Sequence, residues 1–440
     1  MNKKIAIIAD NSVEYVNRLL KIWGDGNCAV LIDWRLPWSK IEEMLKKAGV
    51  SFCIIDEHVK RNICNTAISY EVISRSQTVQ KIDTDCYKLY RANYSNEDAL
   101  ILFSSGTTGK AKGIVLSFFD IETNSDLVAE YMCQTNEKVM YIMKSLAHSS
   151  TVVCELLVSL KRKIKMYVAP TVVPMGFTIK NILKYKVTIT FMNPTLLLLF
   201  NSYVEKKGIK FKNLKSIYIS GSILRSELQR EAECLLEGIK IYNVYGLTEC
   251  GPRVSAQTPG LSWKHGSVGK ALAGIKIEIR DDNGKVLGNM KKGCIWVYTS
   301  TLFTRYLTEE KHVDKRGFYC TRDVGYIEEG ELFIVGRADN MILSGSHNIY
   351  PEEIEEIVNQ IEGIIENVVI SVEDKLYGSR LVCMYVGANQ YVKDLRTFCM
   401  KHLASYEVPH EFICVEEIPK NKNGKILRTG VADLYREMKK

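Results

Sequence analysis

Near the end of its first quarter the chain reads Leu100-Ile101-Leu102-Phe103-Ser104-Ser105-Gly106-Thr107-Thr108-Gly109-Lys110-Ala111-Lys112-Gly113. A run of apolar residues, typical of a buried strand, continues directly into six small residues and two lysines. Such a loop exposes backbone N–H groups and hydroxyls, and its glycines let an anion approach the backbone closely. The composition therefore predicts a phosphate-binding loop at the end of a buried strand.

The spacing within this loop excludes the Walker A pattern. That pattern needs four residues between its glycines and a lysine that is followed by Ser or Thr. Here Thr107 and Thr108 alone separate the glycines, and Ala111 follows Lys110. A kinase or ATPase of the P-loop class is therefore disfavoured.

The sequence before the loop alternates short β-rich runs with longer amphipathic ones. The expected strands are residues 4–9, 28–32 and 52–56, and the expected helices are residues 12–23 and 38–49. This βαβαβ order is the signature of a parallel sheet that is covered by helices.

After the loop, further strands are expected at residues 140–144, 165–169, 187–192 and 216–220. From Ile275 onward, turn clusters separate short strands at residues 277–280, 294–298 and 331–335. A compact tail follows Gly336. The expected fold is α/β, with a large N-terminal region of helix-covered sheets plus a hairpin-rich lobe, and a small mobile α+β C-terminal domain.

The composition is that of an ordinary globular protein, with 440 residues of which 46% are hydrophobic and 25% charged. This excludes intrinsic disorder as the dominant state. The longest apolar runs, such as residues 195–200, fall far short of the ~20 residues that span a bilayer, so no membrane span is expected. Asp10 interrupts the N-terminal apolar run too early for a signal peptide, and we expect a cytoplasmic protein.

The 13 cysteines are scattered, with no Cys-x-x-Cys pair among them. Cys399 and His402 have the spacing of zinc ligands, but no second such pair completes a set of four. A disulfide framework is also disfavoured in a chain of this size. We interpret the cysteines as small buried hydrophobes in a reducing compartment.

Positive charge is concentrated in the body of the chain. The net charge is +8; residues 340–440 carry 12 basic and 15 acidic side chains, and residues 1–339 carry 47 and 36. The basic body favours attraction of a polyanion, such as a nucleotide, a phosphorylated cofactor or an acidic protein. Nucleic acid is disfavoured, because no block of Lys and Arg is interleaved with aromatic residues.

Residues 104–113 resemble the signature loop of the adenylate-forming superfamily, which comprises acyl- and aryl-CoA synthetases, adenylation domains of peptide synthetases and luciferase. Further motifs of that superfamily follow in the expected order, at residues 245–249, 266–270, 318–325, 336–340, 351–355 and 419–425. Together these motifs cover nearly the whole chain, and their ordered set is far more specific than any one of them.

The resemblance implies that a carboxylic acid is activated as an acyl adenylate with ATP and Mg²⁺. It assigns the β- and γ-phosphates to residues 104–109 and Lys112, the α-phosphate to Thr248, and Mg²⁺ to Glu249. It also places adenine on Tyr245, and the ribose hydroxyls on Asp323 with Arg337 beside it. The nucleotide-binding set implied in this way is Ser104, Ser105, Gly106, Thr107, Thr108, Gly109, Lys112, Ser220, Gly221, Ser222, Asn243, Tyr245, Gly246, Asp323 and Arg337.

By the same resemblance, Lys425 is the lysine that reaches the α-phosphate and the carboxylate together. The superfamily works in two half-reactions, between which its C-terminal domain rotates and presents another face to a thiol. The expected domains are residues 1–338, which bind ATP and the acid, and residues 339–440, which carry Lys425, with the hinge at Asp339. Taken alone, Glu249 or Lys425 fits an ordinary surface charge; the joint spacing favours the functional interpretation.

Several features depart from the superfamily pattern. Arg322 stands where a glycine usually precedes the ribose-binding Asp323, Ala111 replaces a usual proline, and Leu343 stands where many members carry Lys. By comparison with that pattern the chain also begins late, and we expect a first, peripheral helical element to be absent. Its loss would expose a face of the sheet lobe and favour a homodimer.

The acid and the thiol acceptor are less well defined. Amino-acid-activating relatives place an Asp in the segment that corresponds to residues 144–150; this segment has none, which favours a simple carboxylic acid. His148 in this segment is a candidate gate of the acid site and equally a core histidine. The candidate pocket walls are Val152, Met192, Asn193, Ser220, Gly221, Ser222 and Val244.

Residues 344–350 resemble the glycine-rich segment of CoA ligases, which favours CoA as the acceptor. The alternative is the phosphopantetheine of an acidic acyl or peptidyl carrier protein, which would also suit the basic body of the chain. A non-catalytic adenylate-binding protein of the same fold is disfavoured, because Glu249 and Lys425 are both present.

Overall fold

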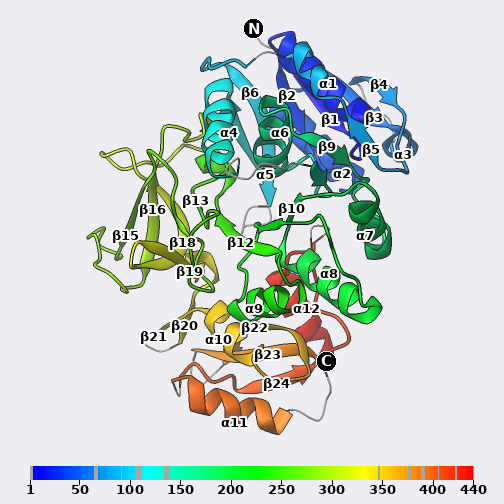
Figure 1. Cartoon of the computed structure of the whole chain (residues 1–440). Helices are drawn as coiled ribbons and strands as arrows, with labels where there is room; N and C mark the ends of the chain where they lie inside the picture. Colours follow the sequence, from blue (N-terminus) through cyan, green and yellow to red (C-terminus); the bar gives the residue numbers. More distant parts are fainter. Residues whose placement is uncertain are drawn as a thin grey trace. The chain divides into compact units, whose positions relative to one another are not determined.

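The computed structural model describes residues 3–63, 68–90, 92–105, 111–132, 139–344, 347–374, 378–387, 392–404, 406–421 and 424–439. The chain forms two compact units. The first contains Met1–Glu278, Trp296–Thr321 and Gly330–Leu332, and the second contains Ile279–Ile295, Arg322–Glu329 and Phe333–Lys440. Figure 1 shows the course of the chain, coloured from blue at the N-terminus to red at the C-terminus.

The first sheet of the first unit has the strand order β17-β7-β6-β2-β1-β3-β4. Its strands are β1 (Lys4–Ile8), β2 (Cys28–Leu31), β3 (Phe52–Asp56), β4 (Ser69–Ile73), β6 (Asp98–Ser105), β7 (Ala111–Ser117) and β17 (Arg305–Tyr306). The run from β6 to β4 is parallel, whereas β7 and β17 are antiparallel to their neighbours. The expected strands at residues 4–9, 28–32 and 52–56 and their parallel pairing are confirmed.

Local sequence explains where the first two helices begin and end. In α1 (Val13–Gly24) the Oγ of Ser12 accepts a hydrogen bond from the backbone N of Tyr15 at 3.0 Å, which caps the helix. In α2 (Trp38–Ala48) the helix stops at Gly49, whose φ of +66° glycine adopts without strain. Helix α2 packs Ile41 on one face of the sheet, among alternate residues of the central strands. Figure 1 shows these blue elements with the short α3 (Glu57–Arg61) beside them.

The second sheet has the order β14-β13-β12-β11-β10-β8-β9-β5. Its strands are β5 (Gln80–Ile82), β8 (Val139–Ile142), β9 (Lys165–Val168), β10 (Ile189–Met192), β11 (Ser216–Ile219), β12 (Lys240–Tyr245), β13 (Ser255–Ala256) and β14 (Lys270–Ala271). The run from β12 to β9 is parallel, and the outer strands are antiparallel. The four strands expected between residues 140 and 220 are therefore confirmed.

Helices cover this sheet through apolar side chains. A core cluster joins strand residues such as Ile217 to residues of α7 (Met175–Lys184), α8 (Pro194–Lys207) and α9 (Ser226–Leu235). The remaining helices of the first unit are α4 (Phe118–Met132), α5 (Ser149–Thr151) and α6 (Val158–Lys161). A π-helical segment, Val152–Leu157, connects α5 to α6. Such wide turns occur frequently at functional sites.

A further sheet has the order β15-β16-β18-β19. Its strands are β15 (Lys276–Arg280), β16 (Gly293–Tyr298), β18 (Tyr319–Glu328) and β19 (Glu331–Arg337). Only Glu329 and Gly330 connect β18 to β19, and both have positive φ, +51° and +81°. This is the geometry of a two-residue hairpin turn.

The C-terminal part of the second unit is a small mixed sheet with helices on both faces. The sheet has the order β22-β23-β24, with β22 (Ile364–Asp374), β23 (Gly378–Gly387) and β24 (Glu411–Cys414), and β20 (Ile342–Ser344) and β21 (His347–Ile349) form a separate two-stranded sheet before it. The helices are α10 (Pro351–Val358), α11 (Val392–His402) and α12 (Arg428–Met438). Val369 packs with α10 and α11, whereas its neighbour Val368 packs with α12. Successive strand residues thus face opposite helices, so both faces of this sheet are buried.

Two further expectations concern membranes and cysteines. In the described part of the chain, no helix is long and apolar enough to cross a bilayer. Among the described cysteines, Cys28, Cys53, Cys154, Cys250, Cys383 and Cys399 are buried. Cys234 is exposed, so the interpretation of the cysteines as buried hydrophobes is wrong for that residue, and it holds only in part for the half-buried Cys86, Cys294, Cys320 and Cys414.

Candidate functional site

The carboxyl ends of four parallel strands meet at one edge of the second sheet. β8, β10, β11 and β12 run parallel. Lys144, Asn193, Ser220 and Gly246 each follow one of these strands within two residues of its end. Ligands of parallel α/β sheets bind at this edge, and two of the candidate pocket walls, Asn193 and Ser220, therefore lie where a ligand is expected.

The glycine-rich loop connects two paired strands. β6 and β7 are antiparallel, with Ser104 opposite Lys112. The residues Gly106, Thr107, Thr108 and Gly109, and the side chains of Ser104 and Ser105, lie outside what the structure describes. The Nζ of Lys112 lies 2.6 Å from Oε2 of Glu309 and 5.6 Å from the ring centre of Tyr306. A phosphate that binds Lys112 must therefore compete with a carboxylate.

Thr248 and Glu249 form a short turn directly after β12. The Oγ1 of Thr248 lies 2.8 Å from Oγ of Ser149, the first residue of α5. Oε1 of Glu249 accepts a hydrogen bond from the hydroxyl of Tyr306 at 3.1 Å. Burial raises the pKa of Tyr306, and the charge of Glu249 raises it further, so this phenol stays protonated as a donor. The structure thus places the two predicted residues beside the carboxyl edge.

The surroundings of Glu249 fit Mg²⁺ bound together with phosphate. Among the described residues, no group of three or more His, Cys, Asp and Glu side chains could hold a metal by itself. Mg²⁺ takes hard oxygen ligands, keeps several waters, and needs only one or two carboxylates beside substrate phosphates. The single carboxylate of Glu249, beside the proposed phosphate site, matches that donor set.

The backbone around Gly246 leaves no room for a side chain. A Cβ at this position would lie 1.9 Å from the carbonyl oxygen of Pro252, so only glycine fits between β12 and the Thr248 turn. The predicted neighbour Asn243 is buried, and its Nδ2 donates to the carbonyl of Ser267 at 3.0 Å. Asn243 therefore supports the edge from within, while Tyr245 is half-buried at the strand end.

Ser220, Gly221 and Ser222 form the turn after β11. Ser220 is buried, and its Oγ lies 3.4 Å from Nζ of Lys144. Gly221 has φ of +100°, a conformation that side chains rarely adopt, and Ser222 is exposed. The turn therefore presents one buried hydroxyl, that of Ser220, to the loop after β8.

His148 begins α5 and is half-buried. It lies near Asp33, which pairs with Arg35 at 2.6 Å. Burial alone would raise the pKa of Asp33, but the hydrogen bonds and charge of Arg35, with a smaller contribution from His148, lower it below its ordinary value. His148 thus faces a carboxylate, and its role as a gate stays a prediction.

In the second unit, Asp323, Arg337 and Lys425 lie in one group of charges. Nη1 of Arg337 donates to Oδ1 of Asp323 at 2.8 Å. The protein around Nζ of Lys425 removes hydration, and Arg337 repels its charge, so the pKa of Lys425 is lowered although part of the residue is exposed. The structure therefore brings together the three predicted residues that the second unit carries.

Arg322 keeps the backbone geometry of the glycine that it replaces. Its φ is +61°, in the left-handed region that favours glycine. Its Nη1 lies 3.3 Å from Oδ1 of Asp339, which also pairs with Arg337 at 3.1 Å. The residue predicted as the hinge is thus held by two guanidinium groups.

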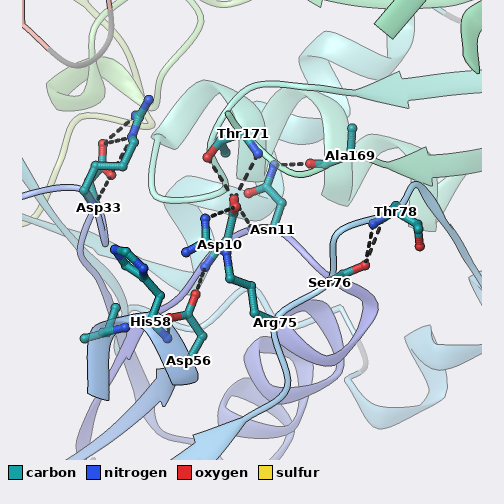
Figure 2. A network of polar contacts seen from close by, with 12 residues as sticks. Asp10, Asn11, Asp33, Asp56, His58, Arg75, Ser76, Thr78, Ala169 and Thr171 are labelled. Carbon is teal, nitrogen blue, oxygen red and sulfur yellow. Dashed lines mark hydrogen bonds and ion pairs between the residues drawn. The ribbon is translucent and has the colours of Figure 1, made fainter. Parts of the chain in front are cut away.

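The carboxyl edge of the first sheet carries a different kind of polar network (Figure 2). Oδ1 of Asp10 accepts hydrogen bonds from the backbone N and Oγ1 of Thr171, at 3.0 and 2.8 Å. Oδ2 of Asp10 pairs with Arg75 at 3.0 Å, and the backbone N of Asp10 donates to Asp56 at 3.0 Å. Asp10 and Asp56 are almost fully buried, so their hydrogen bonds compensate for lost hydration.

Asn11 extends this network to the second sheet. Its Nδ2 donates to the carbonyls of Lys144 and Ala169, at 2.8 and 3.1 Å, and its Oδ1 accepts from the backbone N of Leu146 at 2.9 Å. Asn11 therefore fixes the loop that carries Lys144 and His148.

Sequence reasoning missed one buried ion pair beside this loop. Nζ of Lys144 lies 3.1 Å from Oε1 of Glu155, whose side chain has no solvent exposure. Two signals could have indicated it: a lysine that follows an apolar strand, and one acid within the apolar run of residues 151–160. Neither belongs to a motif of the superfamily pattern described above.

Two family models match the chain. One, described as AMP-binding enzyme, matches residues 1–307; the other, described as AMP-binding enzyme C-terminal domain, matches residues 353–425. The chain belongs to the AMP-binding enzyme family. The resemblance to the adenylate-forming superfamily is therefore confirmed.

Curated relatives of this family member are CoA ligases by name. It is 27% identical to a 2-succinylbenzoate–CoA ligase of Geobacillus sp. (strain WCH70) over 438 residues, which cover 96% of this chain and 86% of the relative. It is 29% identical to a long-chain-fatty-acid–CoA ligase of Yersinia pestis over 380 residues, which cover 83% of this chain and 66% of the relative. This member of the family is thus a homologue of the AMP-forming acid–CoA ligases.

Solved structures share its fold. ATP-bound MatB from Rhodopseudomonas palustris superimposes with a TM-score of 0.87 at 21% identity, over 100% of this chain and 90% of that chain. An o-succinylbenzoate CoA synthetase from Bacillus subtilis, in complex with its acyl-adenylate intermediate, gives a TM-score of 0.82 at 24% identity, over 98% and 88%. The expected mixed α/β fold, with large N-terminal sheets and a small C-terminal domain, is confirmed.

Proposed function

We propose that this protein activates a small carboxylic acid with ATP and Mg²⁺ and then transfers the acyl group to the thiol of CoA. In the first half-reaction a carboxylate oxygen bonds to the α-phosphorus of ATP, and the bond from that phosphorus to pyrophosphate breaks. In the second, the thiolate sulfur of CoA bonds to the acyl carbon, and AMP leaves. Family membership and the CoA ligase names of the relatives support this sequence of steps.

One contact carries the proposal. The hydroxyls of Thr248 and Ser149, 2.8 Å apart, join the turn that carries Glu249 to the loop at the carboxyl edge of the second sheet. With Ser149 as the donor of this hydrogen bond, the Thr248 hydroxyl is available to donate to an α-phosphate oxygen at the edge where a ligand is expected. Negative charge builds up on that phosphate during attack, and donors fixed beforehand stabilise it.

Lys112 and Glu249 would handle the remaining phosphates. Lys112 supplies positive charge once its contact with Glu309 is exchanged for phosphate. Mg²⁺, when held by Glu249, would neutralise phosphate oxygens and make pyrophosphate a better leaving group. Tyr245 and Asp323 are proposed to hold adenine and ribose.

Lys425 provides the main test of the chemical step. Because its cation is proposed to contact both reactants, Lys425→Ala should lower adenylate formation about 100-fold or more, measured as pyrophosphate release. Thioester formation from a pre-made acyl adenylate should be far less affected. Lys420→Ala is the matched control, because Lys420 lies on the same loop as Lys425 but pairs with Glu366 of β22 at 2.8 Å. Equal losses in both half-reactions would contradict the role of Lys425.

The acceptor is tested by adding CoA or a phosphopantetheinylated carrier protein after pyrophosphate release over a panel of acids. Thioester formation with CoA supports the proposal. Thioester formation with the carrier protein alone would reject CoA as the acceptor while leaving the first half-reaction in place.

The domain rotation predicted from the sequence depends on Asp339. Proline fixes φ near −65° and removes a backbone donor, so Asp339→Pro should retain adenylate formation and slow thiol transfer steeply. Asp339→Asn is the control, since it weakens the pairs with Arg322 and Arg337 without constraining the backbone. If both half-reactions of the proline variant stay within a few-fold of wild type, Asp339 is not the hinge.

A further inference from the structure

Lys144 carries a partly buried positive charge at the edge where the acid is proposed to bind. It follows β8 by two residues, and 11% of its side chain is exposed. Its Nζ lies 3.1 Å from Glu155, 3.4 Å from Oγ of Ser220 and 3.5 Å from Oγ of Ser150. It also lies 5.4 Å from the ring centre of Phe191 on β10. The ammonium therefore lies between β10, the end of β11, and the helical residues Ser150 and Glu155 that follow β8.

A second buried lysine in the same unit shows what a fully satisfied ammonium looks like. Lys161 is 10% exposed and its partner Glu122 is not exposed at all, which matches the burial of Lys144 and Glu155. Nζ of Lys161 lies 2.6 Å from Glu122, 2.7 Å from Asp126 and 2.9 Å from Oγ of Ser125. Lys161 is thus held by two carboxylates and a close hydroxyl, as expected for a structural pair.

Lys144 is held far more loosely. One carboxylate lies within 3.1 Å, and both hydroxyl contacts are at the outer limit of hydrogen bonding. An ammonium has three donors, and a buried donor that is poorly used costs free energy. Lys144 can therefore exchange a long hydroxyl contact for a closer acceptor that enters from the carboxyl edge.

The charge around Lys144 is also unbalanced. Within the described residues, the charged groups that act on Glu155 are Lys144 and Arg253, and Arg253 is 1% exposed. Burial raises the pKa of Glu155 from 4.5 to about 7 despite these two cations, so its negative charge is only partly present near neutral pH. The positive charges of Lys144 and Arg253 are therefore opposed by only part of one negative charge, that of Glu155. A further anion would balance the remaining positive charge.

The place of Lys144 relative to the chemistry follows from two adjacent serines. Ser149 contacts Thr248, which is proposed to bind the α-phosphate, and Ser150 contacts Lys144. Ser149 and Ser150 are adjacent residues of α5, so Thr248 and Lys144 both contact this short helix. A group at the far end of the substrate could therefore reach Lys144.

We propose that Lys144 is a specificity-determining residue that binds a second carboxylate of the acid substrate, and that the preferred substrates are dicarboxylic acids. This inference rests on the proposed function. Charge-assisted hydrogen bonds from Lys144, with Ser150 and Ser220 as neighbouring hydroxyls, would hold the second carboxylate while the first reacts.

The test uses pairs of acids in which a methyl group replaces one carboxylate: succinate and butyrate, adipate and hexanoate, terephthalate and 4-methylbenzoate. Wild type should favour the diacid of at least one pair tenfold or more in kcat/KM for pyrophosphate release. In Lys144→Met that ratio should fall about 10- to 100-fold, mainly through a higher KM for the diacid.

Two further variants keep the result interpretable. Lys144→Met leaves Glu155 buried without its lysine, so Lys144→Met/Glu155→Gln is measured beside it to preserve folding. Lys161→Met/Glu122→Gln removes the equally buried structural pair and should leave the ratio of diacid to monoacid unchanged.

Several outcomes would overturn the inference. A wild type that turns over monoacids as well as diacids rejects the inference and leaves the proposed function in place. A folded double variant with an unchanged ratio rejects it, as does a uniform loss of kcat over all acids, which would place Lys144 at the reacting phosphate. A wild type that releases no pyrophosphate with any acid rejects both the inference and the proposed function.

Discussion

The two parallel sheets of the first unit end in very different carboxyl edges. At the edge of the first sheet, Asp10 and Asn11 are buried and use their side-chain oxygens in hydrogen bonds of 2.8 to 3.0 Å. At the edge of the second sheet, Lys144 makes hydroxyl contacts of 3.4 and 3.5 Å. The same topology thus carries one saturated set of polar groups and one that is held loosely.

We interpret the first edge as one that stabilises the fold and the second edge as one that binds the substrate. A saturated buried network contributes to stability and fixes geometry, because each group has replaced its lost water. A loosely held set keeps donors for a ligand. Asn11 connects the two, since it binds the backbone of the loop that carries Lys144. We expect changes at the first edge to act on folding, and changes at the second edge to act on turnover.

The largest effect is expected from Asp10→Ala. Its carboxylate is 1% exposed and pairs with Arg75, which would be left without its buried partner. Breaking such a pair costs about 3–5 kcal/mol, so the urea midpoint should fall clearly. Lys21→Ala, which breaks an exposed pair with Asp25, should leave the midpoint unchanged. If both variants unfold at the same urea concentration, the network around Asp10 does not contribute to stability in the way proposed for the first edge.

A smaller effect is expected from the charge of Glu155. Its pKa is raised from 4.5 to about 7 by burial, so the folded state holds a proton that the unfolded state releases between these pH values. Stability should therefore fall as pH rises from 4.5 to about 7, by about 3 kcal/mol, and then level off. The free energy of unfolding is measured for wild type and Glu155→Gln at several pH values between 4.5 and 7. If it depends on pH in the same way for both proteins, Glu155 does not titrate in this range.

The smallest free-energy effect is expected from Thr248→Ala. Loss of a donor to the α-phosphate should lower adenylate formation about 100-fold, which is about 2.7 kcal/mol, with a change in unfolding free energy below about 1 kcal/mol. Ser149→Ala removes the partner hydroxyl but keeps Thr248, so its effect on pyrophosphate release should stay under about tenfold. A Ser149 variant as slow as the Thr248 variant would assign the donor role to Ser149.

Much of the fold could be predicted from local sequence. The apolar run of residues 52–56 and the cap at Ser12 are signals that the chain carries within a few neighbouring residues. The order of strands could not be predicted in this way, because period-two patterns hold no information about remote partners. The pairing of Arg305–Tyr306 with β7 is an example.

The candidate site shows the same limit. The spacing of the motifs predicted Thr248 and Glu249 as site residues. The structure places both beside the carboxyl edge. Glu155 was not predicted as a site residue, because it lies in the π-helical segment Val152–Leu157. The turns of this segment are wider than the 3.6-residue turns from which helix faces are predicted. Its partner Lys144 is close in space but carries no motif.

Arg322 shows how the absence of a signature glycine can be partly compensated by an ion pair. Glycine in its place would relieve a left-handed backbone that costs roughly 1–2 kcal/mol for other residues. It would also remove the pair with Asp339, a contact worth up to about 1 kcal/mol because 61% of the Arg322 side chain is exposed. The ion pair therefore offsets only part of the backbone cost. A search pattern that demands glycine at this position would pass over this chain, although its backbone here has the left-handed conformation that glycine favours.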